Sequence, residues 1–170
     1  VKHGRVIFNG DGYSDEWQDE AARRGLPNLK ATPEALSVYE TKEAQELFDR
    51  LDVLTPRELH SRYEAYMGQY VMSISVEARS TLEMARTLIY PSVKRFQANL
   101  AGTENELVAL GLGGDTETLT RVTELVTELT CAVAPLAQAI DGLPDAAPIG
   151  EQATYCRETI LPAMNAVRAA

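Results

Sequence analysis

The sequence predicts an all-α fold, and three observations support this prediction. Aromatic residues make up only 6% of the chain, whereas Ala, Leu, Glu and Thr are abundant, a composition that favours helices. Apolar residues recur at steps of three and four through most of residues 55–169. Thr, Pro and Gly stand where helices would begin and end. We therefore expect an elongated antiparallel three-helix bundle over residues 55–170, preceded by a loop and short helices over residues 1–54.

Charge and hydropathy exclude two kinds of partner. The formal net charge of −9 argues against a nucleic acid, because phosphate binding needs a basic surface. The longest uncharged stretch of the hydrophobic second half, residues 129–140, is shorter than the roughly 20 residues that span a bilayer. Cys131 and Cys156 lie on apolar helical faces, so we expect buried thiols of a reducing compartment and a cytoplasmic location.

The first fifty residues contain several residues that typically begin or end helices. Residues 4–8 favour a short strand or an extended arm. Gly25 and Pro27 end a first helix over residues 15–24, and a third helix ends near Leu51. Each of the three short helices is expected to follow a hydroxyl cap, namely Ser14, Thr32 or Thr41. Val1 is not preceded by an initiator Met, so we expect a fragment or a processed chain.

The longest helix has the clearest start signal. Thr55-Pro56-Arg57-Glu58 forms a capping box, and no convincing stop follows until Gly102. Pro91 should bend this helix or split it. Its apolar stripe has a spacing close to the helical period of 3.6 and consists of Met67, Val71, Ile74, Ala78, Leu82, Ala85, Ile89, Val93, Phe96 and Leu100.

Two further helices follow a glycine-rich connection over residues 110–115. The first carries an a/d pattern of Leu119, Val122, Val126, Leu129, Val133, Leu136 and Ile140, and Gly142 and Pro144 close it. The second starts near Pro148 and presents Ala153, Cys156, Ile160, Met164 and Val167 on one face. Pro135 and Pro162 should kink these helices. Short connections between long helices favour an up-down-up arrangement.

The loop Asn9-Gly10-Asp11-Gly12-Tyr13 is the candidate site. An EF-hand calcium loop requires glycine at its sixth position and glutamate at its twelfth, and counting from Asn9 these places hold Ser14 and Glu20. A phosphate loop is also excluded, since no Lys-Ser/Thr pair follows the glycines. We interpret the loop as a set of side-chain turns by its Asn and Asp, with a glycine at positive φ. A substrate or subunit contact remains the alternative.

Other candidate groups favour structural roles. His3 and His60 are the only histidines, which excludes a His-rich zinc site, and we interpret His60 as a packing or capping residue. The stripe formed by Tyr63, Tyr66 and Tyr70 is read as core, with an inter-subunit patch as the alternative. Neither cysteine has the surroundings of a nucleophile. We assign no catalytic residue, metal ligand or cofactor to these residues.

Four segments in order resemble the C-terminal part of type III glutamine synthetases, and together they cover about residues 5–100. They are Phe8-Asn9-Gly10-Asp11-Gly12-Tyr13-Ser14-x-Glu16-Trp17, Arg24-Gly25-Leu26-Pro27-Asn28-Leu29-Lys30, Thr32-Pro33-x-Ala35-Leu36, and Glu58-Leu59-His60-Ser61-Arg62-Tyr63-Glu64 with Tyr70-Val71. Residues 101–170 are similar only in being a long helical hairpin.

The resemblance implies a ligase whose catalytic part lies elsewhere. Enzymes of this family condense glutamate with ammonia, using ATP and Mg²⁺ or Mn²⁺, and they assemble as double-ringed dodecamers. Their catalytic groups come from an upstream β-grasp segment and a larger α/β domain, so no catalytic residue transfers to this chain. The resemblance implies that the long helices brace or assemble the enzyme, that the loop of residues 9–17 meets the catalytic domain, and that this chain alone is inactive. The alternative is a free-standing helical interaction or sensor domain, and a small helical metalloprotein is a weaker one.

Overall fold

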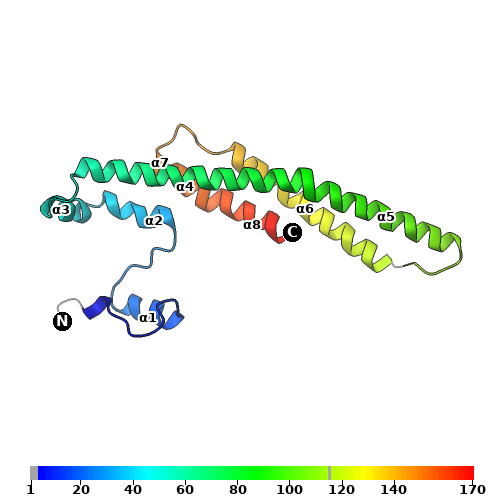
Figure 1. Cartoon of the computed structure of the whole chain (residues 1–170), viewed down its shortest axis with the longest axis horizontal. Coiled ribbons are helices and arrows are strands. Elements are labelled where there is room, and N and C mark those ends of the chain that lie inside the picture. Colours follow the sequence, from blue (N-terminus) through cyan, green and yellow to red (C-terminus); the bar gives the residue numbers. More distant parts are fainter. Residues whose placement is uncertain (1–3, 115) are drawn as a thin grey trace. The chain divides into compact units, whose positions relative to one another are not determined.

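The computed structural model describes residues 4–114 and 116–170, and all regular structure in this part is helical (Figure 1). The predicted all-α class is therefore confirmed. Two compact units divide the chain, one reaching to Leu59 and the other spanning His60–Ala170. Each unit is described by itself. Asp115, which the sequence placed in a connection, and residues 1–3 lie outside the described residues. None of the described helices is long and apolar enough to cross a membrane.

The start of the first unit differs from the expected strand or arm. Gly4–Val6 forms a 3₁₀ turn, η1, and the N–H of Ile7 donates to the carbonyl of Gly4 at 3.0 Å. The reason is that an isolated strand leaves its backbone groups unpaired, and no described segment forms a strand that would pair with this one. A local turn satisfies these groups instead.

Short helices fill the rest of the first unit: α1 (Asp15–Arg23), α2 (Thr32–Leu36), η2 (Ser37–Glu40) and α3 (Lys42–Arg50). The caps of α1 and α3 are as predicted, because Ser14 accepts from the N–H of Trp17 and Thr41 accepts from the N–H of Ala44. The predicted cap of α2 is wrong. Its N-cap is Ala31, which has no side-chain acceptor, so Thr32 is already helical.

Left-handed residues end several of these helices. Gly25 (φ +68°) follows α1 and Gly111 (φ +75°) follows the later helix α5 (Tyr90–Ala109). In each case the residue after the glycine donates a backbone hydrogen bond to the last helical turn. Asp52 plays the same part after α3, with φ 51°, and the N–H of Val53 donates to the carbonyl of Phe48 at 3.1 Å. No glycine stands at this position, yet Asp is among the few residues that tolerate this conformation.

The longest helix begins with the predicted capping box. The N–H of Thr55 donates to Glu58 Oε2 at 2.8 Å, and the N–H of Glu58 donates to Thr55 Oγ1 at 3.3 Å. The helix then runs as α4 (Pro56–Met84), a π turn η3 (Ala85–Ile89) and α5 (Tyr90–Ala109). It passes Gly102, so the predicted stop at that glycine is wrong. A helical glycine costs about 1 kcal/mol relative to Ala, which a long helix tolerates.

Two of the three internal prolines follow a π turn. Pro91 comes two residues after η3, where the N–H of Tyr90 donates to the carbonyl of Ala85. Pro162 comes two residues after η4 (Cys156–Ile160), where Leu161 donates to Cys156 in the same way. Proline clashes with the carbonyl four residues before it, and widening the preceding turn moves that carbonyl aside. Pro135 instead lies inside an unbroken helix, α6 (Thr116–Asp141).

The last helix consists of α7 (Ile149–Tyr155), η4 and α8 (Leu161–Ala169). Within the second unit, α6 contacts both α5 and α8. The long helix also approaches this last helix, because Glu77 Oε2 lies 3.9 Å from Arg168 Nη2 and Cys156 lies close enough to Tyr70 to influence its pKa. Burial is the main cause that raises the pKa of Tyr70, and burial also raises the pKa of the Cys156 thiol.

A core of buried apolar side chains lies among these helices. The last helix buries all five residues that the sequence assigned to its inner face. In α6, Val126, Leu129 and Leu136 of the predicted a/d set are buried, and its other four members are half-buried. In the long helix, the predicted stripe from Met67 to Ala85 is buried except for the half-buried Leu82, and beyond it Val93 and Leu100 stay half-buried whereas Ile89 and Phe96 do not. Ile89 is 47% exposed and Phe96 is 52% exposed, because the extra residue in the π turn rotates the following stretch.

Several predicted interior residues lie at the surface. Cys131 is exposed because it points to the side of α6 opposite Leu129, whereas Cys156 is buried as expected; both are thiols. The side chain of His60 is 52% exposed, lies 3.6 Å from Glu64 Oε1 and stacks on Tyr63. Of the three tyrosines in the stripe, Tyr66 is exposed and the other two are half-buried.

The side chain of Tyr155 contacts the end of α6, and a pair of substitutions tests this contact. Tyr155 donates to the carbonyl of Ala139 at 3.1 Å, and a Cβ added to Gly142 would lie 2.6 Å from that hydroxyl. We expect Gly142→Ala to destabilise the protein by about 1–3 kcal/mol through overpacking. The loss should shrink in a Tyr155→Phe background, which a double-mutant cycle by urea unfolding measures. Equal losses in both backgrounds would contradict this contact.

Candidate functional site

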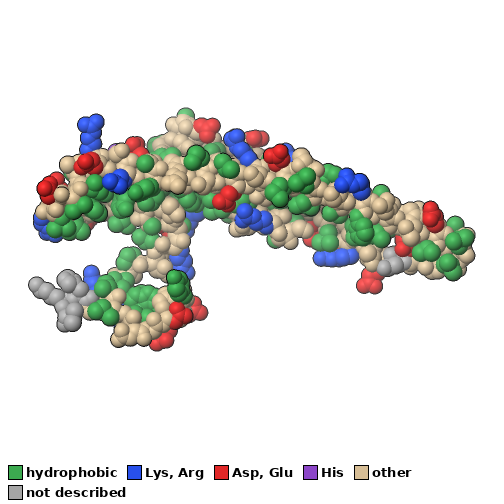
Figure 2. All heavy atoms as spheres, viewed as in Figure 1, with side chains coloured by type: hydrophobic (Ala, Val, Ile, Leu, Met, Phe, Trp, Pro, Cys, Tyr) green, Lys and Arg blue, Asp and Glu red, His purple; other side chains and the backbone are tan. Residues whose placement is uncertain are grey.

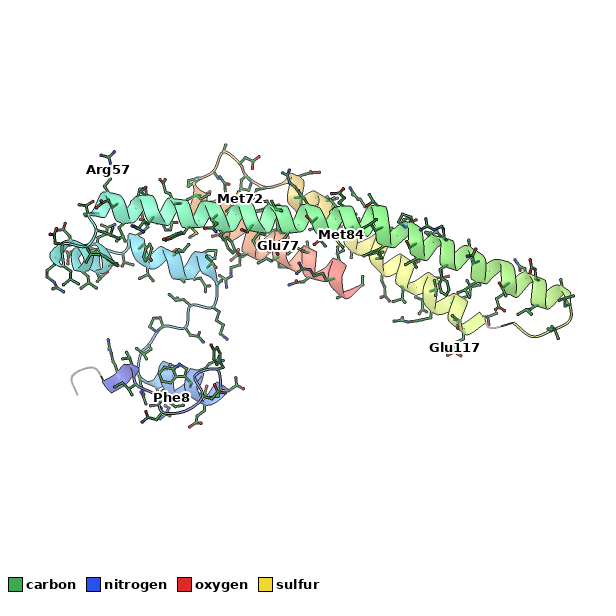
Figure 3. The ribbon with its side chains drawn as sticks, in the orientation of Figure 1. Phe8, Arg57, Met72, Glu77, Met84 and Glu117 are labelled. Carbon is green, nitrogen blue, oxygen red and sulfur yellow. The ribbon has the colours of Figure 1, made fainter. Side chains whose placement is uncertain are left out.

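The candidate site is a small cluster in the first unit, built on α1 and the loop that precedes it. The ring of Phe8 stacks on Trp17 with centroids 4.7 Å apart and planes at 29° (Figure 3). The guanidinium of Arg24 also lies over the Trp17 ring, 5.5 Å from its centroid. Such cation–π and aromatic contacts favour one geometry of the cluster. Trp17 therefore contacts both a loop residue and the residue at the end of the helix.

Arg24 ties the chain before the loop to α1. Its Nη1 donates to the carbonyl of Ile7 at 2.7 Å and to that of Arg5 at 3.1 Å. Its Nε donates to Glu20 one turn earlier, and Glu20 also pairs with Arg23. A guanidinium has five donors in a rigid fork, so one side chain can fix two backbone carbonyls and a carboxylate together. This hydrogen-bonding pattern positions the loop.

The charge of Glu20 responds to this arrangement. The hydrogen bond from Arg24 holds the pKa of Glu20 below its ordinary value of 4.5, and the charges of Arg23 and Arg24 act in the same direction against partial desolvation. The carboxylate is therefore favoured in the folded state. Its stabilising contribution is present above the unfolded pKa and is lost as the pH falls through the lower folded pKa.

The five predicted site residues have different roles. Asp11 Oδ1 accepts from the N–H of Tyr13 at 2.9 Å, and the Asp11 carbonyl accepts from Ser14, which confirms the side-chain turn at Asp11. The expected positive φ is wrong for Gly10 and Gly12. Gly10 is required for a different reason, since a Cβ there would lie 2.7 Å from the Phe8 ring. Asn9 lies beside it in the loop and is exposed.

A shallow hollow opens beside the cluster. Its volume is about 840 Å³, and its lining combines the loop with α1 and the segment after α1: Gly12, Tyr13, Trp17, Gln18, Ala21, Leu26, Pro27, Asn28 and Lys30. Tyr13 stands at its edge and is 97% exposed. Lys30 is the one charged side chain in this lining. A surface of aromatic, amide and aliphatic groups suits contact with another protein surface better than proton transfer.

Sequence reasoning missed the residues that organise this hollow. Trp17 and Arg24 belong to two of the four segments that resemble the family, but their mutual contact was not predicted. Their separation of seven residues, two helical turns, is the signal that would have placed them on one face. Within the ranges 4–114 and 116–170, no three His, Cys, Asp or Glu side chains are grouped as they would be around a metal ion.

Comparison with known proteins identifies the family. Residues 1–107 match the family model described as the glutamine synthetase C-terminal domain. Over 176 aligned residues the chain is 34% identical to the type-3 glutamine synthetase of Dictyostelium discoideum, covering 99% of this chain and 24% of that protein. It is 41% identical over 101 residues to a glutamine synthetase of Butyrivibrio fibrisolvens, covering 59% of this chain and 14% of that protein.

The chain belongs to the glutamine synthetase C-terminal domain family. It corresponds to the C-terminal region of type III enzymes, as the four sequence segments predicted. The chain spans about a quarter of the length of the Dictyostelium relative and less of the bacterial ones. Similarity to the Dictyostelium protein also extends through residues 101–170, where no motif had been recognised.

The cluster around Trp17 gives a second test. We expect Arg24→Gln to loosen the loop by about 1–2 kcal/mol, because two backbone carbonyls lose a charged donor. Trp17 is the only tryptophan, so its fluorescence reports this cluster alone. The emission should shift to longer wavelength and become more accessible to a quencher. Arg23→Gln is the matched control, since it removes a neighbouring arginine that also pairs with Glu20. Equal spectra for the two variants would contradict the role of Arg24.

Acid provides a third test of the same cluster. As the pH falls below about 4.5, protonation of Glu20 should weaken its bond to Arg24 and change the Trp17 emission. Glu20→Gln should lack this step while keeping any change that other carboxylates cause. A titration of Trp17 emission that is the same in the variant and the natural protein would show that Glu20 does not control the cluster.

Proposed function

We propose that this chain is the mechanical C-terminal region of a type III glutamine synthetase, which braces the catalytic domain and helps the subunits to assemble. The main support for this proposal is that nearly the whole chain aligns with only 24% of the Dictyostelium enzyme. The full-length subunit would make glutamine from glutamate, ammonia and ATP with Mg²⁺ or Mn²⁺, in the cytoplasm. Its catalytic groups would come from the other three-quarters of the subunit, and this chain alone would be inactive.

In this proposal residues 1–54 form the junction with the catalytic domain of the same subunit. The support is the apolar surface of this segment, whose exposed large side chains are Val6, Ile7, Tyr13, Leu29, Val38, Leu47, Leu51 and Val53. Exposed apolar groups in such number indicate a surface that another protein surface covers. The loop Asn9-Gly10-Asp11-Gly12-Tyr13 and the hollow beside it would meet the catalytic body directly, with Tyr13 as the most exposed contact.

Residues 55–170 would serve assembly as an antiparallel three-helix bundle. The support comes from α6, which contacts both the long helix and α8, and from the ion pair between α4 and α8. Helix pairs that bury a continuous seam transmit force along their length, because close-packed interiors deform little. We propose that the subunits form a homo-oligomer, a dodecamer by analogy with the family.

The proposal predicts that catalysis and assembly depend on different parts of the subunit. An activity assay, a deletion and a graft test this prediction. Incubated with ATP, Mg²⁺, glutamate and ammonia, this chain should yield no glutamine. The Dictyostelium enzyme with its aligned C-terminal segment deleted should form smaller assemblies than the intact enzyme, measured by light scattering after gel filtration. Grafting this chain in place of the deleted segment should restore the larger assembly.

A matched pair of variants sharpens this experiment. Tyr13→Ser in the grafted chain should lower the fraction of large assembly and the melting temperature, because it removes a junction contact. Leu112→Ser, which changes a 57% exposed side chain of the second unit, should leave that junction intact. Turnover by the chain alone, or full assembly of the deleted enzyme, would contradict the proposal.

A further inference from the structure

The core of the second unit ends part of the way along its long helix. Between Ala85 on that helix and Val126 on α6, no described residue is buried. α8 ends at Ala169, and its last residues line the same hollow as Ala85. Beyond this level, α5 and the first half of α6 continue as a hairpin of two helices (Figure 1). Figure 2 shows hydrophobic side chains at the surface along this part. Three packed helices therefore become two at Ala85.

The π turn η3 lies at this change from three helices to two. Ala85 is the one buried residue within η3, and Pro91 stands two residues after the turn ends. Because Pro91 cannot donate a backbone hydrogen bond, the helix has one bond fewer at this point. π turns and prolines are the usual places where long helices bend. The long helix is therefore easiest to bend where its core ends.

The other π turn, η4, has different surroundings. It is also followed by a proline two residues later, Pro162. However, both ends of η4 are buried, at Cys156 and Ile160, and Met164 continues the buried face one turn further. Close packing on successive turns resists bending, because the interior deforms little. Of the two π turns, only η3 has a core on one side of it alone.

Both helices of the hairpin carry a second feature that favours bending near this level. On the long helix, the hydroxyls of Thr87 and Ser92 donate to the carbonyls four residues earlier, at 2.8 Å and 2.7 Å. On α6, Thr127 and Thr130 do the same at 2.9 Å and 2.7 Å. Such bonds compete for carbonyls that the helix backbone uses, and they often bend helices. A hairpin can bend only if both of its helices yield at one level, and both carry these bonds there.

Two hollows beside η3 leave room for movement. They enclose about 570 Å³ and about 170 Å³, and Ala85 and Leu129 line both of them. Side chains can move into such space, whereas a close-packed interior resists rearrangement. Further out, the two helices are tied together, because Gln97 Nε2 on α5 donates to Thr123 Oγ1 on α6 at 2.7 Å. The hairpin can therefore move as one piece while its base bends.

We propose that the hairpin swings as an arm about a hinge formed by residues 85–91 of the long helix and residues 127–130 of α6. A few residues that absorb the change in backbone angles are enough for such a hinge. The 20 residues of α5 are about 30 Å long, so a bend of about 20° moves the tip of the hairpin by roughly 10 Å. The swing changes the width of the larger hollow, which is lined by Val167 before the hinge and by Val93 beyond it. This inference goes beyond the proposed function and does not depend on it.

Distances between spin labels test the hinge in the whole 170-residue chain. In a Cys131→Ser background, labels at Asn165→Cys and Asn105→Cys report the position of the hairpin relative to α8; both sites are exposed, and Cys156 is buried. Labels at Asn165→Cys and Met72→Cys form the control pair, because both sites lie in the three-helix stretch. Excess unlabelled protein restricts the signal to distances within one chain. We expect the distribution to Asn105 to be broader than the control by about 5 Å or more.

Two proline variants locate the hinge. Pro91→Ala restores a backbone donor and removes the ring that clashes with the preceding turn, so it should narrow the distribution to Asn105 toward the width of the control. Pro162→Ala makes the same change after η4, inside the core, and should leave that distribution unchanged. Circular dichroism checks that both variants keep their helix content.

Two results would overturn the proposal. If the distribution to Asn105 in the natural sequence is as narrow as that of the control pair, the hairpin does not swing. If it is broad but Pro91→Ala leaves it as broad as Pro162→Ala does, the motion does not arise at η3. Neither result bears on the assembly role, which the deletion and the graft test separately.

Discussion

The buried seam shared by α4, α6 and the last helix determines which parts of the second unit are rigid. Its most completely buried large side chains come from all three helices: Met67, Leu136, Cys156, Ile160 and Met164. Truncating side chains of this kind costs about 2–5 kcal/mol each, whereas the same change at an exposed position costs little. The seam ends at Ala85 on the long helix and Val126 on α6. Beyond these residues the hairpin is held only by the contact between its two helices.

This uneven distribution of the core supports the proposed mechanical role. The stretch with three helices shares one buried core, and the hairpin beyond it has exposed apolar side chains. The first unit works on a different basis, because Arg24, Trp17 and Phe8 hold a polar loop in one shape without a large core. Both surfaces are consistent with the proposed role in joining larger bodies, and the similarity to type III glutamine synthetases places the chain in their C-terminal region.

The sequence predicted the helical class, most helix starts and the inner face of the last helix, because caps and periodicity are local signals. The sequence-based predictions failed where contacts between distant residues, or small changes that add up along a helix, determine the structure. The stripe drawn through Ile89 and Phe96 assumed an unbroken α-helix, whereas a π turn interrupts the helix there and both residues are exposed. Periodicity also cannot show where a neighbouring helix ends, so it could not locate the end of the core.

The candidate loop shows the same contrast. The turn at Asp11 follows from its side chain alone, but the need for glycine at position 10 comes from the ring of Phe8, which packs back over the loop. The role of Arg24 depends on carbonyls more than fifteen residues away, and no spacing rule in the sequence announces such bonds.

Amide hydrogen exchange tests the central claim most directly. We expect amides around Met67–Ala85, Val126–Leu136 and Ala153–Val167 to be strongly protected, since they open only with the core. Amides of residues 90–114 and 116–125 should exchange faster, because they lie outside that core. Uniform protection along α4, α5 and α6 would contradict the claim that the hairpin lacks a core of its own.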